Sequence, residues 1–277
     1  MHLRPVRAII GSMNVRFVVR GTLLALIVVL LVAATVVLVN GPGRIFLPPD
    51  ATPPHPIITV PRGLLPTSPV GLIEWTRYGA EPYRPVARGF LLRLANGDRV
   101  GITTAHSISF AAVPPLQGVA LVIGGHSAPV FVFDTLRGEP GIARTGEDMT
   151  VDYVLLDVPR DAPIDPALVI EPDPRGLPQP GERVSMYTVL GNGPRVLTGT
   201  VQTAADQAVW VLMDDDFDPS GLSGSPFVSQ YTGKVVGMAI ATTRRGGKVL
   251  LGLHPIGSLV QRAEAAKTFL KIADFRR

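Results

Sequence analysis

The chain contains no cysteine among its 277 residues, which excludes disulfide bonds and thiolate metal sites. Charged residues are sparse, and much of the basic excess behind the formal net charge of +4 sits in the two tails. The sequence has no basic stripe interleaved with aromatic residues, so we expect no binding to nucleic acid. It also has no cluster of metal-ligating residues and no phosphate-binding glycine loop, so we expect neither a metal nor a cofactor.

Residues 21–39 form an uninterrupted uncharged run dominated by Leu, Val, Ile and Ala. At about 1.5 Å per residue this run spans roughly 28 Å as a helix, close to the hydrocarbon thickness of a bilayer. A cleaved signal peptide is the alternative, but its apolar core is usually about 7–15 residues long. We therefore expect a transmembrane signal-anchor helix that leaves a basic tail, 1–20, in the cytoplasm. The remainder of the chain would lie outside, at a bacterial cell envelope.

Prolines recur throughout residues 40–69, where they disfavour both helix and central strand. The composition is typical of an extended spacer, which would hold a globular domain away from the membrane. From residue 70 onward, short apolar runs alternate with turn signals, and one of these, Asn96-Gly97, predicts a hairpin. The strand-like runs are 88–94, 99–104, 119–123, 130–133, 153–158, 183–190, 195–203, 208–213, 226–229 and 235–241.

Two later segments break this β pattern. Residues 159–180 are again rich in proline and predict a connector across the surface. Apolar residues at helical spacing predict a C-terminal helix over about 258–271, with Ser258 and Gln261 resembling a capping box at its start. The many short strands predict an all-β barrel or sandwich, and periodicity alone leaves that choice open.

The run Gly221-Leu222-Ser223-Gly224-Ser225-Pro226 suits a tight turn that presents a hydroxyl and aims main-chain N–H groups at one point. Acyl transfer needs such an arrangement, although most Gly/Ser/Pro clusters are plain turns. Two upstream segments supply partners for a serine nucleophile. His106 stands in Thr-Ala-His-Ser at the end of one strand-like run, and Asp152 opens Asp-Tyr-Val-Leu-Leu at the start of another.

Together these three segments resemble the signature segments of trypsin-like serine proteases of the chymotrypsin fold, bacterial in type and here membrane-anchored. The order His, Asp, Ser is the chymotrypsin order and differs from the subtilisin and α/β-hydrolase orders. The similarity spans roughly residues 70–262. It implies an all-β protease domain over 70–277, built from two six-stranded antiparallel β-barrels at about 70–160 and 181–255. The connector 159–180 would join the barrels, and the helix would close the domain.

The resemblance also implies a role for each motif residue. Ser223 would be the nucleophile, His106 its general base, and Asp152 the acceptor that fixes the histidine tautomer. The main-chain N–H groups of Gly221 and Ser223 would form the oxyanion hole, where glycine suits the required backbone conformation. The rivals that match the motifs less well are His2, His126, His254, Asp148, Asp157, Ser220 and Ser225.

Three departures from the family pattern limit the substrate prediction. Leu222 stands where trypsins commonly carry an aspartate, and residues 235–241 lack the Ser-Trp-Gly whose serine supports the catalytic aspartate. Phe217 falls at the base of the specificity pocket, between Asp216 and Asp218. A preference for lysine or arginine at the cleaved bond is therefore not predicted.

The sequence as a whole predicts a membrane-anchored serine endopeptidase that hydrolyses peptide bonds of an extended polypeptide through an acyl-enzyme. The alternative is a catalytically silent peptide-binding module on the same fold. An esterase on an α/β-hydrolase sheet is disfavoured by the motif order and by the lack of Gly-x-Ser-x-Gly around Ser223. The natural substrate, the activation mechanism and the oligomeric state stay open.

Overall fold

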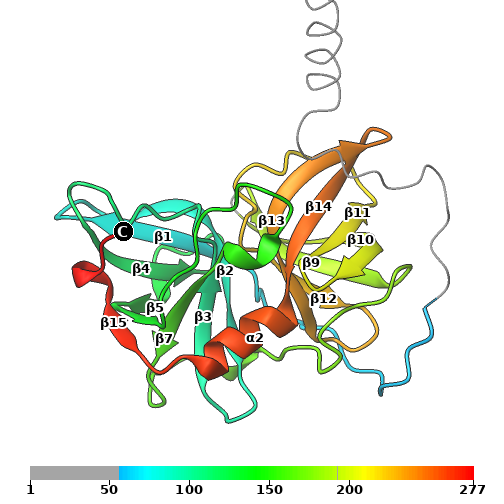
Figure 1. The fold of residues 1–277 in the computed structure, drawn as a ribbon, viewed down its shortest axis with the longest axis horizontal. Coiled ribbons are helices and arrows are strands. Elements are labelled where there is room, and N and C mark those ends of the chain that lie inside the picture. The colour runs from blue at the N-terminus through cyan, green and yellow to red at the C-terminus, as the bar shows by residue number, and fades with distance from the viewer. Residues whose placement is uncertain (1–55, 192) are drawn as a thin grey trace, which may run out of the picture. The chain divides into compact units, whose positions relative to one another are not determined.

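The structure, a computed structural model, describes residues 56–191 and 193–277, all of which belong to one compact unit, Ala51–Arg277. Figure 1 shows two curved β-sheets side by side, with α2, the one α-helix of the described residues, along their lower side in that view. The predicted tail at 1–20 and transmembrane helix at 21–39 lie outside the described residues. Within the described ranges no helix is both long and apolar enough to cross a membrane.

The first sheet has nine strands in the spatial order β15-β6-β7-β3-β2-β1-β4-β5, with β8 paired to β2. Its strands are β1 Leu72–Tyr78, β2 Arg84–Arg93, β3 Arg99–Thr103, β4 Leu116–Val122, β5 Pro129–Phe133, β6 Thr135–Arg137, β7 Val154–Val158, β8 Val169–Ile170 and β15 Phe269–Lys271. The prediction of a closed six-stranded barrel is met only in part in this half, because the strand order does not form a closed ring. β5 pairs with β4 and β6 pairs with β7, and since only Asp134 separates β5 from β6, the sheet curls so that these two ends meet. β6 also pairs with β15.

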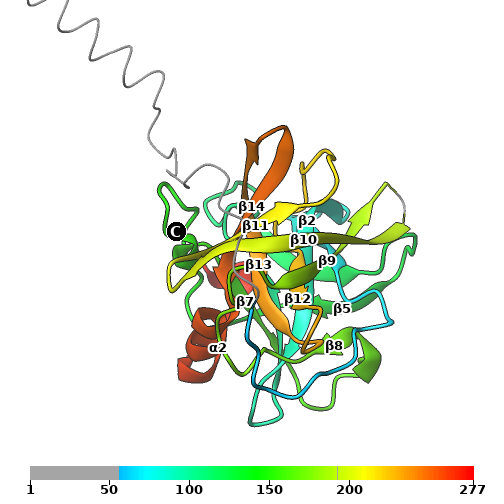
Figure 2. The ribbon, with the colours of Figure 1, turned by 90° about the vertical axis from the view of Figure 1, so that its right-hand side faces the viewer.

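The second sheet is a closed six-stranded barrel in the order β10-β11-β14-β13-β12-β9, and Figure 2 views the molecule from this side. Here the predicted barrel is confirmed. Closure leaves no strand edge free for pairing with another chain. Its strands are β9 Arg183–Leu190, β10 Gly193–Ala205, β11 Ala208–Met213, β12 Pro226–Ser229, β13 Val235–Arg245 and β14 Lys248–Pro255.

Alternating apolar side chains give each sheet its own core. Leu72, Leu91 and Phe133 belong to the first buried cluster, and Met186 and Phe227 belong to the second. The predicted hairpin is present, because β2 and β3 pair antiparallel around a turn in which Gly97 has a φ of +83°. A positive φ is what favours glycine at this position.

The C-terminal segment differs from its prediction. Helix α2 spans Ile256–Ala265, and its N-cap is Pro255 without a side-chain hydrogen bond, so the capping box at Ser258 is wrong. The helix also ends before Phe269, which belongs to β15 and pairs with Arg137 of β6. The exposed edge of β6 offers unpaired main-chain groups, and pairing with them outweighs the weak helical periodicity after residue 265.

The proline-rich segments lie against the domain. Residues 56–69 contain no helix or strand, and they pack on the second barrel through hydrogen bonds from Gly63 N–H to Tyr231 O (2.9 Å) and from the Tyr187 hydroxyl to Pro66 O (2.9 Å). This part of the predicted spacer therefore belongs to the folded unit. The connector contains one 3-10 turn, Pro166–Leu168, and the short strand β8. Arg175 fastens it by pairing with Asp173 and Glu182.

Arg137 joins α2 to the first sheet. This buried side chain donates to Ala263 O of the helix (2.9 Å) and pairs with Asp98 (3.0 Å) and Asp157 (3.7 Å). We predict that Arg137→Leu lowers the free energy of unfolding by about 3 kcal/mol, because it leaves the buried carbonyl of Ala263 and the half-buried carboxylate of Asp157 without this partner. Arg160→Leu is the matched control, since Arg160 pairs with the same Asp98 (2.9 Å) but is exposed.

Urea unfolding of the two variants measures this difference. The exposed control should cost less than about 1 kcal/mol. Equal losses in both variants would show that Arg137 acts as an ordinary surface ion pair.

Candidate active site

His106 and Asp152 are in direct contact. Nδ1 of His106 lies 2.8 Å from Oδ2 of Asp152, whose side chain is fully buried, while a third of the His106 side chain is exposed. His106 follows β3 by three residues, and Asp152 caps the 3-10 turn Met149–Val151 directly before β7. Since β3 and β7 are neighbours in the first sheet, the ladder between them brings the two motifs together.

Main-chain N–H groups hold the Asp152 carboxylate. Oδ1 accepts from Ala105 N–H (2.7 Å) and His106 N–H (3.1 Å), and Oδ2 also accepts from Arg144 N–H (3.3 Å). Burial by itself would raise the pKa of Asp152, but the hydrogen bond and charge of His106 and these N–H donors outweigh it and lower the pKa. The carboxylate therefore stays ionised without the family's supporting serine.

The rival acids have other partners. Asp148 is the N-cap of the 3-10 turn and accepts from Thr150 N–H (2.8 Å). Asp157 lies on β7 and faces Arg137. Among these three acids, only Asp152 contacts a histidine ring nitrogen at hydrogen-bond distance.

The Ser223 loop connects β11 to β12 and is fixed by its main chain. Ser223 O accepts from Arg88 N–H (2.8 Å), and Gly224 N–H donates to Ala239 O (2.8 Å). Gly224 has a φ of +91°, and a Cβ there would lie 1.8 Å from Arg88 O. Only glycine therefore lets this loop approach β2 so closely.

The neighbouring serines are engaged elsewhere. The Ser220 hydroxyl donates to the exposed Asp218 (2.6 Å), and the buried Ser225 hydroxyl lies 2.8 Å from Thr188 Oγ1. Ser223 is half-buried. Within the described residues no hydrogen bond links its hydroxyl to His106, a contact that often tightens only when substrate binds.

The two N–H groups assigned to the oxyanion hole are not used within the loop. Leu222 N–H donates to Pro219 O (3.2 Å), whereas no main-chain hydrogen bond of the described loops uses Gly221 N–H or Ser223 N–H. Gly221 has a φ of +72° with no atom within 4 Å of an added Cβ. Glycine is needed at 221 for conformation, not for space.

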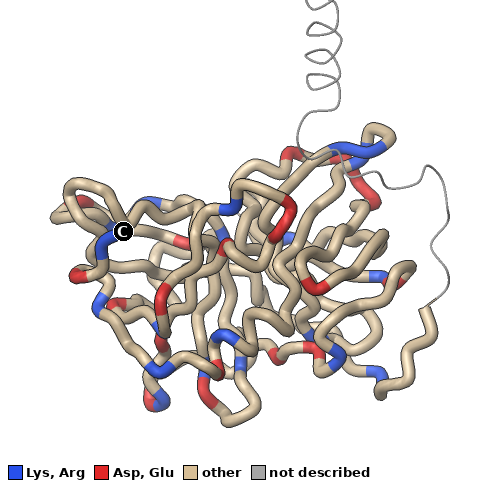
Figure 3. Tube along the Cα trace, viewed as in Figure 1, with Lys and Arg blue, Asp and Glu red and all other residues tan. Residues whose placement is uncertain are grey.

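The departures from the family pattern have physical explanations. Leu222, in place of an aspartate, is buried and belongs to the core cluster of the second barrel, against which Phe217 also packs. The loop is thus anchored by apolar packing where the pattern would use a charge. The acidic run before it is largely neutralised, because Asp216 pairs with Arg244 (2.6 Å) and Asp214 pairs with Arg183. Figure 3 shows acidic and basic residues interspersed over both sheets.

Sequence reasoning missed Glu74, a fully buried carboxyl on β1 behind the histidine loop. Its oxygens accept from the hydroxyls of Thr103 and Ser107, the latter at 2.9 Å. Burial raises the pKa of Glu74 to about 7, against the lowering effect of these hydroxyls and of His106. The sequence did contain a signal for the burial of Glu74, because Glu74 and Thr76 share one strand face with the apolar Leu72.

Two other histidines are placed by the structure. His126 lies in the turn between β4 and β5. His254 lies on β14, fully buried, with Nδ1 3.5 Å from Asp152 O and its ring edge-on to Tyr153. Burial lowers the pKa of His254 to about 4, so it stays neutral and acts as packing behind Asp152.

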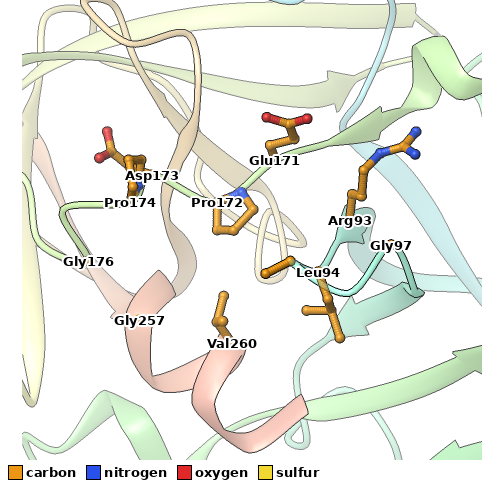
Figure 4. Close-up of a pocket in the computed structure, with 11 residues that line it drawn as sticks. Arg93, Leu94, Gly97, Glu171, Pro172, Asp173, Pro174, Gly176, Gly257 and Val260 are labelled. Carbon is orange, nitrogen blue, oxygen red and sulfur yellow. The ribbon is translucent and has the colours of Figure 1, made fainter. Parts of the chain in front are cut away.

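A pocket of about 520 Å³ lies where α2, the turn after β2 and the connector meet. Figure 4 shows Leu94, Pro172 and Val260 converging on it. None of His106, Asp152 or Ser223 lines this pocket, so its size says nothing about the chemistry of the triad.

Solved structures show the same fold. A thermostable serine protease, AL20, from an extremophilic microorganism matches with a TM-score of 0.50 and 13% identity, covering 73% of this chain and 98% of its own. Human heparin binding protein matches with a TM-score of 0.52 and 15% identity, covering 76% of this chain and 96% of its own. No family model and no curated protein matches the sequence. The chain therefore has a chymotrypsin-like fold.

The two loop glycines should respond differently to substitution. We predict that Gly224→Ala destabilises the protein strongly or prevents folding, because the added methyl meets main-chain atoms of Arg88. Gly221→Ala should cost only about 1–2 kcal/mol, the cost of a left-handed conformation. Urea unfolding compares the two, and equal costs would show that the loop does not rest on β2 as described.

Glu74 and His254 should make the free energy of unfolding depend on pH in opposite directions. The pKa of Glu74 rises from 4.5 to about 7 on folding, so its contribution is present below pH 4.5 and is lost as pH rises to 7. The pKa of His254 falls from 6.5 to about 4, so its contribution is present above pH 6.5 and is lost as pH falls to 4. Each amounts to about 3 kcal/mol, and in the parent they largely cancel between pH 4.5 and 6.5.

Single substitutions should expose each contribution. Over this interval the stability of Glu74→Gln should rise with pH, and that of His254→Phe should fall. Urea unfolding at pH 4.5, 5.5 and 6.5 measures the slope, which is independent of any constant loss from the substitution. Slopes equal to that of the parent in both variants would contradict the assigned ionisation states.

Proposed function

We propose that the protein is a membrane-anchored serine endopeptidase that uses His106, Asp152 and Ser223. The observation that carries the proposal is the 2.8 Å contact between His106 Nδ1 and the buried Asp152 carboxylate. Three main-chain N–H groups fix this carboxylate, so the imidazole has one defined orientation. A silent binding module would not need an ionised, buried acid aligned on a histidine.

In the proposed mechanism His106 is neutral before the reaction. Because Asp152 accepts from Nδ1–H, the lone pair of His106 is on Nε2. Nε2 takes the proton from the Ser223 hydroxyl as its oxygen attacks the carbonyl carbon of the peptide. Asp152 then stabilises the imidazolium, which returns the proton to the leaving amine.

The Gly221 and Ser223 N–H groups would stabilise the negative charge that develops on the carbonyl oxygen. Losing one such donor costs about 10²–10³ in rate in comparable sites. The resulting acyl-enzyme is hydrolysed by water that His106 activates in the same way. The reaction uses only groups of this chain, acting on an extended polypeptide.

The proposal also includes the position of the protease unit relative to a membrane. The apolar run 21–39 would cross the bilayer, with the basic tail 1–20 in the cytoplasm and the protease unit outside, at a bacterial cell envelope. The folded unit begins before Gly63 on the back of the second barrel. The stretch between the run and the unit would therefore be shorter than the whole proline-rich segment.

A fluorophosphonate probe that cannot cross membranes tests reaction and location together. We predict that the full-length chain is labelled on intact spheroplasts, that Ser223→Ala abolishes labelling, and that Asp152→Asn slows it by up to about 10⁴-fold. Ser220→Ala is the matched control, because its exposed hydroxyl lies on the same loop and should be dispensable.

Each other outcome removes part of the proposal. Labelling that survives Ser223→Ala would identify a different nucleophile. A folded parent that is never labelled would favour the silent module. Labelling only after lysis would place the protease unit in the cytoplasm and overturn the anchor topology.

A further inference from the structure

Glu74 is a fully buried carboxyl beside the histidine loop, and the proposed mechanism gives it no task. Its Oε2 accepts from the hydroxyls of Thr103 and Ser107, the latter at 2.9 Å. A carboxyl loses its water on burial, at a cost that only hydrogen bonds and nearby charges offset. An ionisable group kept in the core next to a catalytic loop is therefore a candidate for a role in the reaction.

Glu74 contacts the histidine loop on both sides of His106. Thr103 ends β3, three residues before His106, and Ser107 follows His106 directly in the chain. Hydrogen bonds to an ionised acceptor are about twice as strong as those between neutral groups. An ionised Glu74 thus fixes the main chain before and after His106 from a single point in the core.

The surroundings of Glu74 place one charged partner near it. Glu74 pairs with Ala87 of β2 and with Leu121 of β4, both apolar and buried. Arg88 pairs with the residue before Glu74, so its side chain lies on the opposite face of the sheet. Among the described residues, His106 is the only charged group that shifts the pKa of Glu74, and it lowers that pKa.

The interaction between Glu74 and His106 is reciprocal. A positive charge on His106 favours the ionised form of Glu74, so an ionised Glu74 favours the imidazolium to the same extent. In the proposed mechanism His106 is neutral at first and becomes an imidazolium as Ser223 attacks. A negative charge on Glu74 therefore stabilises the transition state more than the ground state, which is the condition for raising the rate.

We propose that ionised Glu74 is a positioning residue of the protease, fixing the loop around His106 and stabilising its imidazolium. The proposal rests on the proposed function, because it assumes that His106 takes the proton of Ser223. Glu74 contacts no reacting atom and acts through Thr103, Ser107 and the charge of His106. Asp152 orients the imidazole ring through Nδ1, so the two buried carboxyls have separate tasks.

This role should depend on pH, because burial raises the pKa of Glu74 to about 7. The contribution to the rate is present above pH 7, where Glu74 is ionised. It is lost as the pH falls below 7 and Glu74 takes up a proton. Glutamine has nearly the same size and stays neutral, so Glu74→Gln reproduces the charge of the protonated form at every pH.

The rate constant for fluorophosphonate labelling of the full-length chain, measured from pH 5.5 to 8.5, tests this inference. The ratio of the parent rate to that of Glu74→Gln should be near 1 at pH 5.5 and reach about 10 at pH 8.5, the effect of one pKa unit of interaction. The rise should be centred near pH 7. Both proteins contain His106 and Ser223, so the direct titration of His106 affects both rates.

Thr76→Val is the matched control. Thr76 is also buried and lies on the same face of β1 as Glu74, two residues further along. Valine has a similar shape and no charge changes, so the ratio of the parent rate to that of Thr76→Val should vary less than about 2-fold over the same pH range.

Ser107→Ala tests the same inference with Glu74 left in place. The Ser107 hydroxyl lowers the pKa of Glu74, so its removal raises that pKa. Near pH 7.5 Glu74 is then more protonated in the variant than in the parent, whereas at pH 5.5 and pH 9 the two agree. The ratio of parent to variant rate should therefore be about 2-fold higher near pH 7.5 than at either extreme.

The outcomes separate this inference from the proposed function. If labelling depends on Ser223 but both ratios are the same at every pH, Glu74 is only structural and the protease still stands. If the ratio for Glu74→Gln falls as pH rises, the neutral carboxyl is the active form and the inference is overturned. A folded parent that is never labelled would overturn both proposals.

Discussion

The main chain of Arg88 holds the two parts of the candidate site together. Its N–H donates to Ser223 O (2.8 Å), and its carbonyl accepts from the Thr103 hydroxyl (2.8 Å), three residues before His106. The guanidinium of Arg88 also donates to Val189 O of β9 (2.7 Å). One residue of β2 thus fastens the serine loop of the second barrel to the histidine loop of the first sheet, and Gly224 is required because it passes so close to Arg88 O.

At these contacts between the two loops, main-chain donors and apolar packing stand where the trypsin-like pattern has polar side chains. Asp152 receives three N–H groups where the pattern has a serine hydroxyl. Leu222 is buried in the barrel core where the pattern has an aspartate.

The sequence predicted best the elements whose local pattern agrees with their environment. Runs such as Val154–Val158 and Arg183–Leu190 lie in cores and were evident as strands. Strand β1 was missed because it buries Glu74 and Thr76, polar residues that interrupt an apolar pattern. Strand β14 was missed although its residues 249–253 form an apolar run. The end of α2 was missed because β15 forms only by pairing with β6, which lies more than a hundred residues away.

The site residues, too, were predictable where a local sequence motif identifies them. His106, Asp152 and Ser223 stand in local motifs, and the first two meet in the structure, whereas Arg88 acts through main-chain atoms that any residue has. The packing of residues 56–69 on the barrel could not be predicted from composition either, because a high proline content indicates an extended backbone but not what that backbone contacts. Hydrogen bonds between main-chain atoms far apart in the chain could not be predicted from the sequence.

The Glu74 cluster has fewer protons than acceptors. The hydroxyls of Thr103 and Ser107 have one proton each. They face both Glu74 and two main-chain carbonyls, Arg88 O and Thr104 O, each at 2.8 Å. An ionised Glu74 draws both protons to itself, because a charged acceptor forms the stronger bond. A protonated Glu74 is itself a donor, which frees the Thr103 hydroxyl to donate to Arg88 O. The protonation state of Glu74 therefore decides whether Arg88, which binds Ser223 O, is fixed by this second hydrogen bond.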